Sequence, residues 1–63
     1  MEYSDKHAHI ITIGDTVNVD KTEDNQEFTG TVIGFEENGH YVVVEDMDGD
    51  AFCVEEWEVE VNN

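Results

Sequence analysis

The sequence predicts an all-β fold, a small five-stranded barrel with a short helical turn before the last strand. From Ile10 onward, apolar residues alternate with polar ones at the period of two that is typical of strands. β-branched residues dominate, and no long stretch shows helical spacing. A chain of 63 residues forms one domain at most, and its short strands are expected to curl into a barrel rather than leave a flat sheet in water.

The N-terminal part of the chain is predicted to hold a tail, a first strand region and a long loop. Residues 1–9 show no periodicity, so they are expected to form a flexible tail before a single domain at 10–63. The first strand region follows, with an interruption at Gly14. Residues 20–27 contain no apolar side chain, which predicts a loop.

The remaining elements follow at short intervals. They are strands at about 28–36, 40–46, 51–55 and 59–61, with one helical turn at 56–58. The dipeptide Asn38-Gly39 is the strongest short hairpin signal in the chain, because both residue types accept positive φ at little cost.

The lengths of two turns determine which side chains face the core. A two-residue turn at 38–39 pairs Ile33 with Val44. At the next turn, a three-residue loop ending in a left-handed Gly49 pairs Val44 with Phe52, whereas a two-residue loop would bring a carboxylate into the apolar face. This register predicts a core face made of Ile33, Phe35, Val42, Val44, Phe52 and Val54.

Three segments of the chain carry a resemblance to known folds. They are 13–19, which contains Gly-Asp-x-Val-x-Val, then 29–35, which contains Gly-x-Val, and the Asp48-Gly49 hairpin. Together they resemble the Src-homology-3-like small barrels, including Tudor and KOW modules, over residues 11–61. The resemblance implies a binding role, since members of these families bind peptides, methylated side chains, RNA, or ribosomal and polymerase partners.

This chain has only some of the residues that these families use to bind their ligands. KOW modules that contact RNA use basic loops, which this sequence lacks. Tudor modules use an aromatic cage, and at least two of the aromatic side chains here are expected in the core. Those available are Tyr3, Phe28, Phe35, Tyr41, Phe52 and Trp57. The resemblance therefore implies the fold and leaves the activity open.

The charge of the chain excludes several classes of partner. Seventeen Asp and Glu face two Lys and no Arg, a formal net charge of −15. Binding to nucleic acid depends on Lys and Arg, and anionic membranes attract the same residues, so neither is expected as a direct partner. A single cysteine, no signal-peptide pattern at the N-terminus and no apolar run long enough to span a membrane favour a cytoplasmic protein.

The sequence predicts neither metal binding nor catalysis. Asp46, Asp48 and Asp50 match positions 1, 3 and 5 of a calcium loop, but the required Gly and Glu are replaced by Ala51 and Trp57. The residues that could bind zinc, His7, His9, His40 and Cys53, lack paired spacing. Cys53 also has no Lys or Arg neighbour in sequence, and nearby carboxylates are expected to raise its pKa. No cofactor and no enzymatic activity are expected.

The last nineteen residues concentrate the negative charge. They hold Glu45, Asp46, Asp48, Asp50, Glu55, Glu56, Glu58 and Glu60. Carboxylates spaced rigidly on strands can imitate the phosphates of a nucleic acid, and small acidic bacteriophage proteins inhibit DNA-binding proteins of the host in this way. This chain resembles them in size, charge and simplicity of fold, which predicts a nucleic-acid mimic that binds a basic protein surface in the host cytoplasm. A Tudor- or KOW-like accessory module without mimicry is the alternative, and a solubility face or a salt-adapted proteome is the plain explanation.

An apolar patch is predicted beside these acids. The register places Val32, Tyr41, Val43 and Cys53 on the outer face, rimmed by Glu36, Glu45 and Glu55. Such a patch usually marks an interface, either with a partner or between two copies of the chain, unless the N-terminal segment covers it. The predicted binding residues are therefore Glu45, Asp46, Asp48, Asp50, Glu55, Glu56, Glu58, Tyr41 and Val43, in a monomer or a homodimer.

Overall fold

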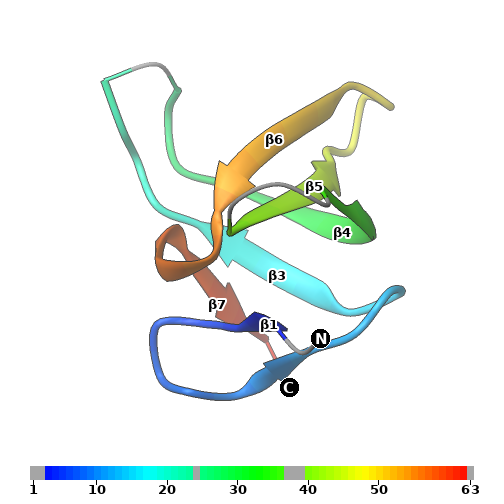
Figure 1. The fold of residues 1–63 in the computed structure, drawn as a ribbon. Coiled ribbons are helices and arrows are strands. Elements are labelled where there is room, and N and C mark those ends of the chain that lie inside the picture. Colours follow the sequence, from blue (N-terminus) through cyan, green and yellow to red (C-terminus); the bar gives the residue numbers. More distant parts are fainter. Residues whose placement is uncertain (1–2, 24, 37–39, 63) are drawn as a thin grey trace.

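The computed structural model describes residues 3–23, 25–36 and 40–62, and its fold is all-β, as predicted. In chain order the elements are β1 (Tyr3–Ser4), β2 (Ile10–Ile11), β3 (Thr16–Val19), β4 (Phe28–Phe35), β5 (Tyr41–Glu45), β6 (Ala51–Glu55), the 3-10 turn η1 (Glu56–Glu58) and β7 (Val59–Val61). Five strands form one antiparallel sheet in the order β6-β5-β4-β3-β7, and β1 pairs with β2 alone (Figure 1).

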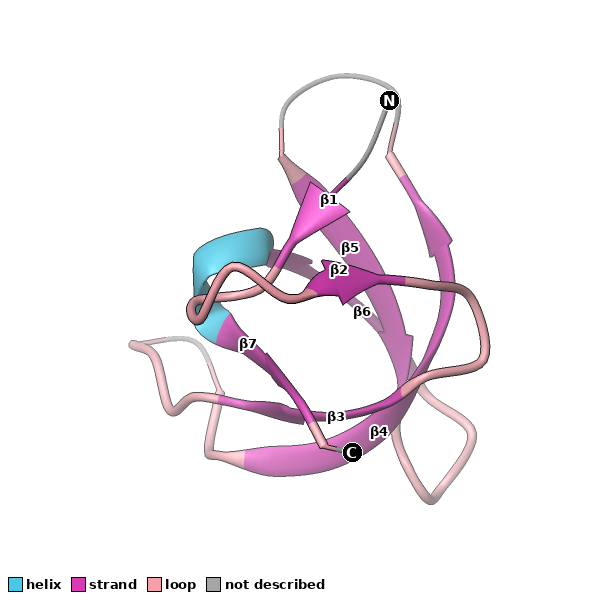
Figure 2. Ribbon diagram, turned by 90° about the horizontal axis from the view of Figure 1, so that it is seen from below, coloured by secondary structure: helices cyan, strands magenta, loops and turns pink. Residues whose placement is uncertain are grey.

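The sheet is strongly bent, and its concave side surrounds a single hydrophobic core (Figure 2). All five strands of the sheet contribute to this core, and the short β1–β2 pair adds two more side chains. The buried apolar residues are Tyr3, Ile11, Val17, Val19, Val32, Val42, Val44, Val54, Val59 and Val61, with Phe28, Phe35 and Phe52 partly buried against them. The β-branched residues that predict strands in the sequence are thus also the main contents of the core.

The predicted pairing of β5 with β6 is confirmed. Val44 lies opposite Phe52 and Val42 lies opposite Val54, as the three-residue loop requires. Gly49 has a φ of 88°, and its N–H donates to the carbonyl of Asp46 at 3.1 Å. A left-handed residue at this point supplies the bulge that makes an odd loop compatible with a hairpin.

The predicted register between β4 and β5 is correct at one end and wrong at the other. Phe35 pairs with Val42 as expected, but a bulge between Val32 and Gly34 places Val32, not Ile33, opposite Val44. Val32 is therefore 0% exposed, and Ile33 is 44% exposed. A bulge adds one residue to a strand and exchanges the faces beyond it. The intervening turn at 38–39 lies outside the described residues.

The N-terminal segment differs from the flexible tail expected for residues 1–9. Tyr3 is buried, its ring stacks on Phe35 with centroids 4.6 Å apart, and its hydroxyl donates to the carbonyl of Glu36 at 2.6 Å. The strands on this segment and its partner are two residues long, which is too short to show a period in the sequence. Residues 3–9 therefore pack on the sheet.

Candidate functional site

The predicted acidic binding residues form two clusters at opposite ends of β6. The hairpin cluster, Glu45, Asp46, Asp48 and Asp50, lies at the β5–β6 turn, and the helical-turn cluster, Glu55, Glu56 and Glu58, lies at η1. At about 3.3 Å per residue, the five residues of β6 separate the two clusters by roughly 13 Å or more. The acids therefore do not make one continuous row.

Asp46 holds the hairpin turn together. One of its carboxylate oxygens accepts hydrogen bonds from the backbone N–H groups of Asp48 and Asp50, both at 2.9 Å. The N–H of Asp46 also donates to the carbonyl of Asp50 at 2.8 Å. Glu45, Asp48 and Asp50 are exposed, and no ion pair joins them to another described residue. Three carboxylates of the hairpin cluster thus face solvent on a backbone that the fourth one orders.

The helical-turn cluster is instead partly used by the fold. The Glu56 carboxylate accepts the N–H of Ser4 at 3.0 Å and lies 3.1 Å from Nδ1 of His40. The Glu58 carboxylate accepts the N–H of Glu55 at 3.0 Å and so closes the first turn of η1. These two side chains bind β1 and η1 to the rest of the molecule, which makes them poor candidates for contacts with a partner.

The apolar patch lacks one of its four predicted members. Tyr41, Val43 and Cys53 lie on the outer face of β5 and β6, where Val43 is opposite Cys53, but Val32 is in the core. Partial burial and the carboxylate of Glu36, whose Oε1 accepts from the thiol at 3.5 Å, raise the pKa of Cys53. The raised pKa agrees with the expectation from sequence and disfavours a reactive thiolate.

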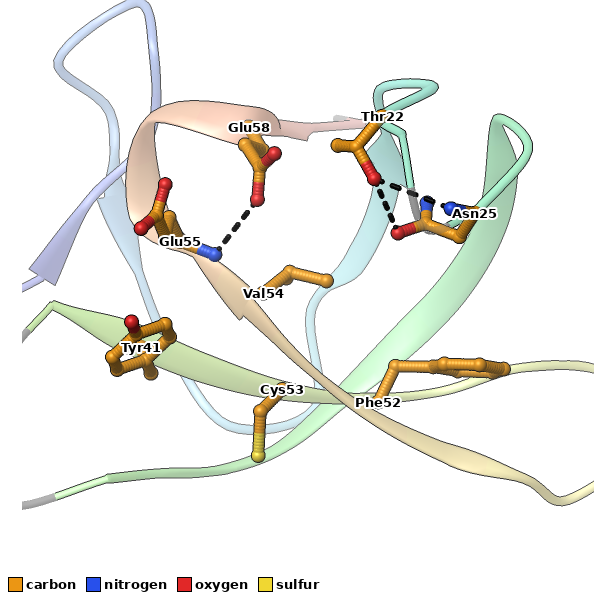
Figure 3. Close-up of a pocket in the computed structure, with 8 residues that line it drawn as sticks. All are labelled: Thr22, Asn25, Tyr41, Phe52, Cys53, Val54, Glu55 and Glu58. Atoms are coloured by element: carbon orange, nitrogen blue, oxygen red, sulfur yellow. Dashed lines mark hydrogen bonds between the residues drawn. The ribbon is translucent and has the colours of Figure 1, made fainter.

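A pocket of about 350 Å³ adjoins the patch along β6 (Figure 3). It is lined by Thr22, Asn25, Tyr41, Phe52, Cys53, Val54, Glu55 and Glu58. Sequence reasoning missed the contribution of Thr22 and Asn25, because a polar loop carries no pattern that tells which strand it will face. Their side chains are joined by a hydrogen bond from Thr22 Oγ1 to Asn25 Oδ1 at 2.8 Å.

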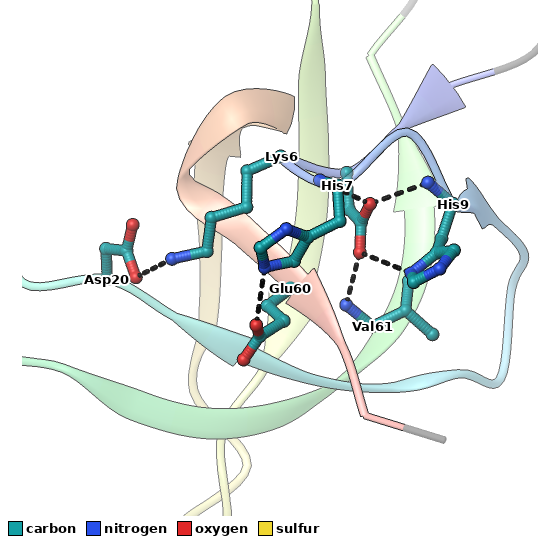
Figure 4. A network of polar contacts seen from close by, with 7 residues as sticks. Lys6, His7, His9, Asp20, Glu60 and Val61 are labelled. Carbon is teal, nitrogen blue, oxygen red and sulfur yellow. Dashed lines mark hydrogen bonds and ion pairs between the residues drawn. The ribbon is translucent and has the colours of Figure 1, made fainter.

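A buried carboxylate near the N-terminus is the second feature that sequence reasoning missed (Figure 4). The side chain of Asp5 is 0% exposed and accepts three backbone N–H groups, from His7 at 2.9 Å, His9 at 2.7 Å and Val61 at 2.7 Å. Burial raises the pKa of the Asp5 carboxyl, but the hydrogen bonds from Val61, His9 and His7, with the nearby His9 ring, more than reverse this and lower the pKa. Asp5 is therefore a charged group held inside the fold.

Asp5 and Asp46 order turns of the same design. In both, the carboxylate accepts the N–H groups two and four residues later, and the N–H of the Asp donates to the carbonyl four residues later. Ala8, with a φ of 66°, takes the place that Gly49 takes in the hairpin. The shared signal in the sequence is an Asp followed three residues later by a small residue.

Two further contacts surround Asp5. Lys6 Nζ lies 2.7 Å from Asp20, and His7 Nε2 lies 2.7 Å from Glu60. The carboxylate of Asp20 raises the pKa of Lys6 through this hydrogen bond, against a smaller opposing effect of burial. Each histidine thus contacts the carboxylate of one acidic residue. Among the described residues, no group of three or more His, Cys, Asp or Glu could hold a metal ion.

No protein-family model matches this chain, and no curated protein matches it. In the described part of the chain, no helix is long and apolar enough to cross a membrane.

Proposed function

We propose that this protein is a small acidic binding module that mimics nucleic acid and occupies a basic surface of a DNA- or RNA-binding protein. The observation that carries the proposal is the hairpin cluster. Glu45, Asp48 and Asp50 are exposed and have no ion-pair partner among the described residues, and the Asp46 carboxylate orders the turn that presents them. Because the turn is ordered before binding, the hairpin itself would lose little conformational freedom on contact with a partner.

The overall charge supports the same proposal. The acidic side chains that give 63 residues a net charge of −15 repel one another and destabilise the compact state. A protein with a purely structural role would gain nothing from this charge. A basic partner would be attracted at long range and would associate faster at low salt. In this proposal the protein acts in the cytoplasm, which is that of the host if a bacteriophage encodes it.

The finer features of the fold belong to the proposal as well. We take the bent sheet to be a five-stranded Src-homology-3-like barrel, and the single core shared by all five strands supports this. We also take the protein to be a binder and not an enzyme, and the raised pKa of the Cys53 thiol disfavours that residue as a nucleophile in the pocket.

Capture of partners from a bacterial lysate tests the function. We expect the wild type to retain nucleic-acid-binding proteins, and duplex DNA or salt to release them. Asp48→Lys/Asp50→Lys should abolish most of this capture. Glu23→Lys/Glu27→Lys changes the net charge by the same amount in the exposed loop between β3 and β4, and it should retain most of the capture. Retention of no nucleic-acid-binding protein, or equal loss with both double variants, would contradict mimicry.

A Tudor- or KOW-like module without mimicry is the second candidate, and the pocket along β6 favours it. Tyr41 and Phe52 supply aromatic surface there, beside the carboxylates of Glu55 and Glu58. Under this alternative, Tyr41→Ala would abolish capture, the hairpin variant would retain it, and DNA would not compete. The same lysate experiment therefore separates the two candidates.

A further inference from the structure

The two edge strands of the five-stranded sheet differ in whether the N-terminal segment of the chain covers them. β7 forms one edge, and Val59 and Val61 each have an outward backbone group that is paired with the N-terminal segment. The N–H of Lys6 donates to the carbonyl of Val59 at 3.0 Å, and the N–H of Val61 donates to the carboxylate of Asp5 at 2.7 Å. The segment that follows β1 thus covers this edge.

β6 forms the opposite edge, and its outward groups can be identified from the hydrogen-bonding pattern. The N–H of Glu56 donates to the carbonyl of His40, and the N–H of Asp46 donates to that of Asp50, so these two pairs are hydrogen-bonded across β5 and β6. Hydrogen-bonded pairs alternate with non-bonded ones in an antiparallel ladder. The N–H and C=O groups of residues 51, 53 and 55 therefore point away from the sheet.

This edge is open at its centre. The N–H of Glu55 is bound by the Glu58 carboxylate, but the N–H groups of Ala51 and Cys53 form no hydrogen bond with any described residue. Both residues are exposed. An unpaired edge of this kind is a template for another extended chain.

The pocket described above lies along the same edge. It separates β6 from Thr22 and Asn25 of the loop between β3 and β4, with Phe52 and Val54 also in its lining (Figure 3). Cys53, one of the two residues with an open backbone N–H, therefore also lines the cavity, and an extended segment laid along β6 would both complete the ladder and enter the cavity.

We infer that the free edge of β6 binds an extended, basic segment of the partner as a sixth strand of the sheet. The inference rests on the proposed function and names the kind of partner segment that the acidic module recognises. Backbone hydrogen bonds to residues 51 and 53 would supply affinity, and Lys or Arg at alternate positions would meet Glu55 on the outer face of the edge.

Charge selects this occupant over a second copy of the chain. Asp50 adjoins one end of β6, and Glu55 and Glu58 lie at the other. Antiparallel pairing of two β6 strands would bring these carboxylates from both copies close together, with no Lys on either strand to compensate. A basic segment turns the same charges into attraction.

Two blocked octapeptides of equal charge test the inference by calorimetric titration. An alternating Thr-Lys peptide can donate and accept along either edge, whereas the same peptide N-methylated at every residue has no backbone N–H to donate on either edge. We expect the Thr-Lys peptide to bind at least about tenfold more tightly, the ratio that two modest hydrogen bonds would give. Amide exchange at Ala51 and Cys53 should slow in the wild-type protein when this peptide is present.

A pair of variants at one position isolates the backbone group. Cys53→Pro removes the thiol and an outward N–H but no hydrogen bond of the sheet, which an edge strand tolerates, and Cys53→Ser removes the same thiol but keeps the N–H. The proline variant should lose the preference for the Thr-Lys peptide, and the serine variant should keep it. If the proline variant does not fold, amide exchange in the wild type decides the question.

Several results would overturn the inference. Equal affinity for the two peptides would mean binding by charge alone, which removes edge pairing and leaves the proposed function intact. Dimerisation of the free protein with slower exchange at the same two amides would show that a second copy is the occupant. Failure of both peptides to bind would also remove edge pairing, while the proposed function is judged separately by the hairpin variants in the lysate capture.

Discussion

Removing the Asp5 carboxylate should destabilise the protein more than any other single change to an acidic side chain. Asp5→Ala leaves the N–H groups of His7, His9 and Val61 without their acceptor. An orphaned buried donor costs about 1–3 kcal/mol, and a hydrogen bond to a charged group contributes about 1.5–3 kcal/mol. Since two of the three donors are only partly buried, we expect a loss on the order of 3–5 kcal/mol.

Such a loss equals most or all of the stability of a domain this small, which is about 3–5 kcal/mol. Asp5→Asn should be nearly as damaging, because the amide has one oxygen for two sets of donors. If that oxygen accepts from His7 and His9, the NH₂ group faces the N–H of Val61, and two donors then oppose each other inside the fold.

Asp46→Ala is the matched control, since Asp46 makes the same two turn hydrogen bonds but none to a sheet edge. Both of its bonds are exposed, so we expect a loss of about 1 kcal/mol. The assay is urea unfolding followed by circular dichroism. Equal losses for Asp5→Ala and Asp46→Ala, or a loss below about 1 kcal/mol for Asp5→Ala, would refute the role assigned to the buried carboxylate.

The pH dependence of stability gives an independent check on Asp5. Its pKa is lower in the folded than in the unfolded chain, so its contribution is fully present above the ordinary Asp pKa, near 3.9, and is lost as the pH falls through the folded value. Repulsion among the other acids weakens over the same fall in pH. We therefore expect the free energy of unfolding of the wild type, measured by urea unfolding, to rise from pH 7 to about 5 and to decline below about 4.

The remaining predictions concern charge, core and backbone. The melting temperature should rise between low salt and about 0.5 M NaCl, where the Debye length falls to about 4 Å, and an unchanged temperature would mean that the acids barely repel one another. Val44→Ala should cost about 2–3 kcal/mol in urea unfolding, because the side chain is 0% exposed, whereas Val43→Ala on the outer face should cost under about 1 kcal/mol. Ala8→Gly should stabilise the protein by up to about 1 kcal/mol, since it removes the strain of a φ of 66°, and destabilisation would show that this strain is absent.

Much of the fold follows from local signals in the sequence. The strands from β4 to β7 and the turn η1 lie within a residue or two of the predicted ranges, because alternation and turn residues act over short distances. The β5–β6 register was also predicted correctly, because of the two loop lengths considered only the three-residue loop keeps the carboxylate of Glu55 out of the core face. The prediction was correct where the hydrophobic pattern allowed a single register of the strands.

The errors arose where two contacts competed for one strand. β4 pairs with β3 on one side and β5 on the other, and Val32 also exchanges hydrogen bonds with Gly14 and Asp15. The bulge at Ile33 accommodates both sets, and the adjacent pair Val32-Ile33 gives no sign of which side chain will turn outward. The packing of Tyr3 and the burial of Asp5 depend on contacts with residues more than thirty positions away, which no local pattern encodes.

The division of the acids between fold and surface determines how binding must be tested. From the sequence alone, Asp46 and Glu56 are as suitable for charge reversal in a binding test as any other acidic residue of the C-terminal region. In the structure the first orders the hairpin and the second ties β1 to η1, so reversing either charge would disturb the fold. Loss of binding in such a variant would then be mistaken for loss of a contact. Asp48 and Asp50 carry the same charge on the same turn, their carboxylates form no ion pair with another described residue, and their replacement changes the surface while leaving its support in place.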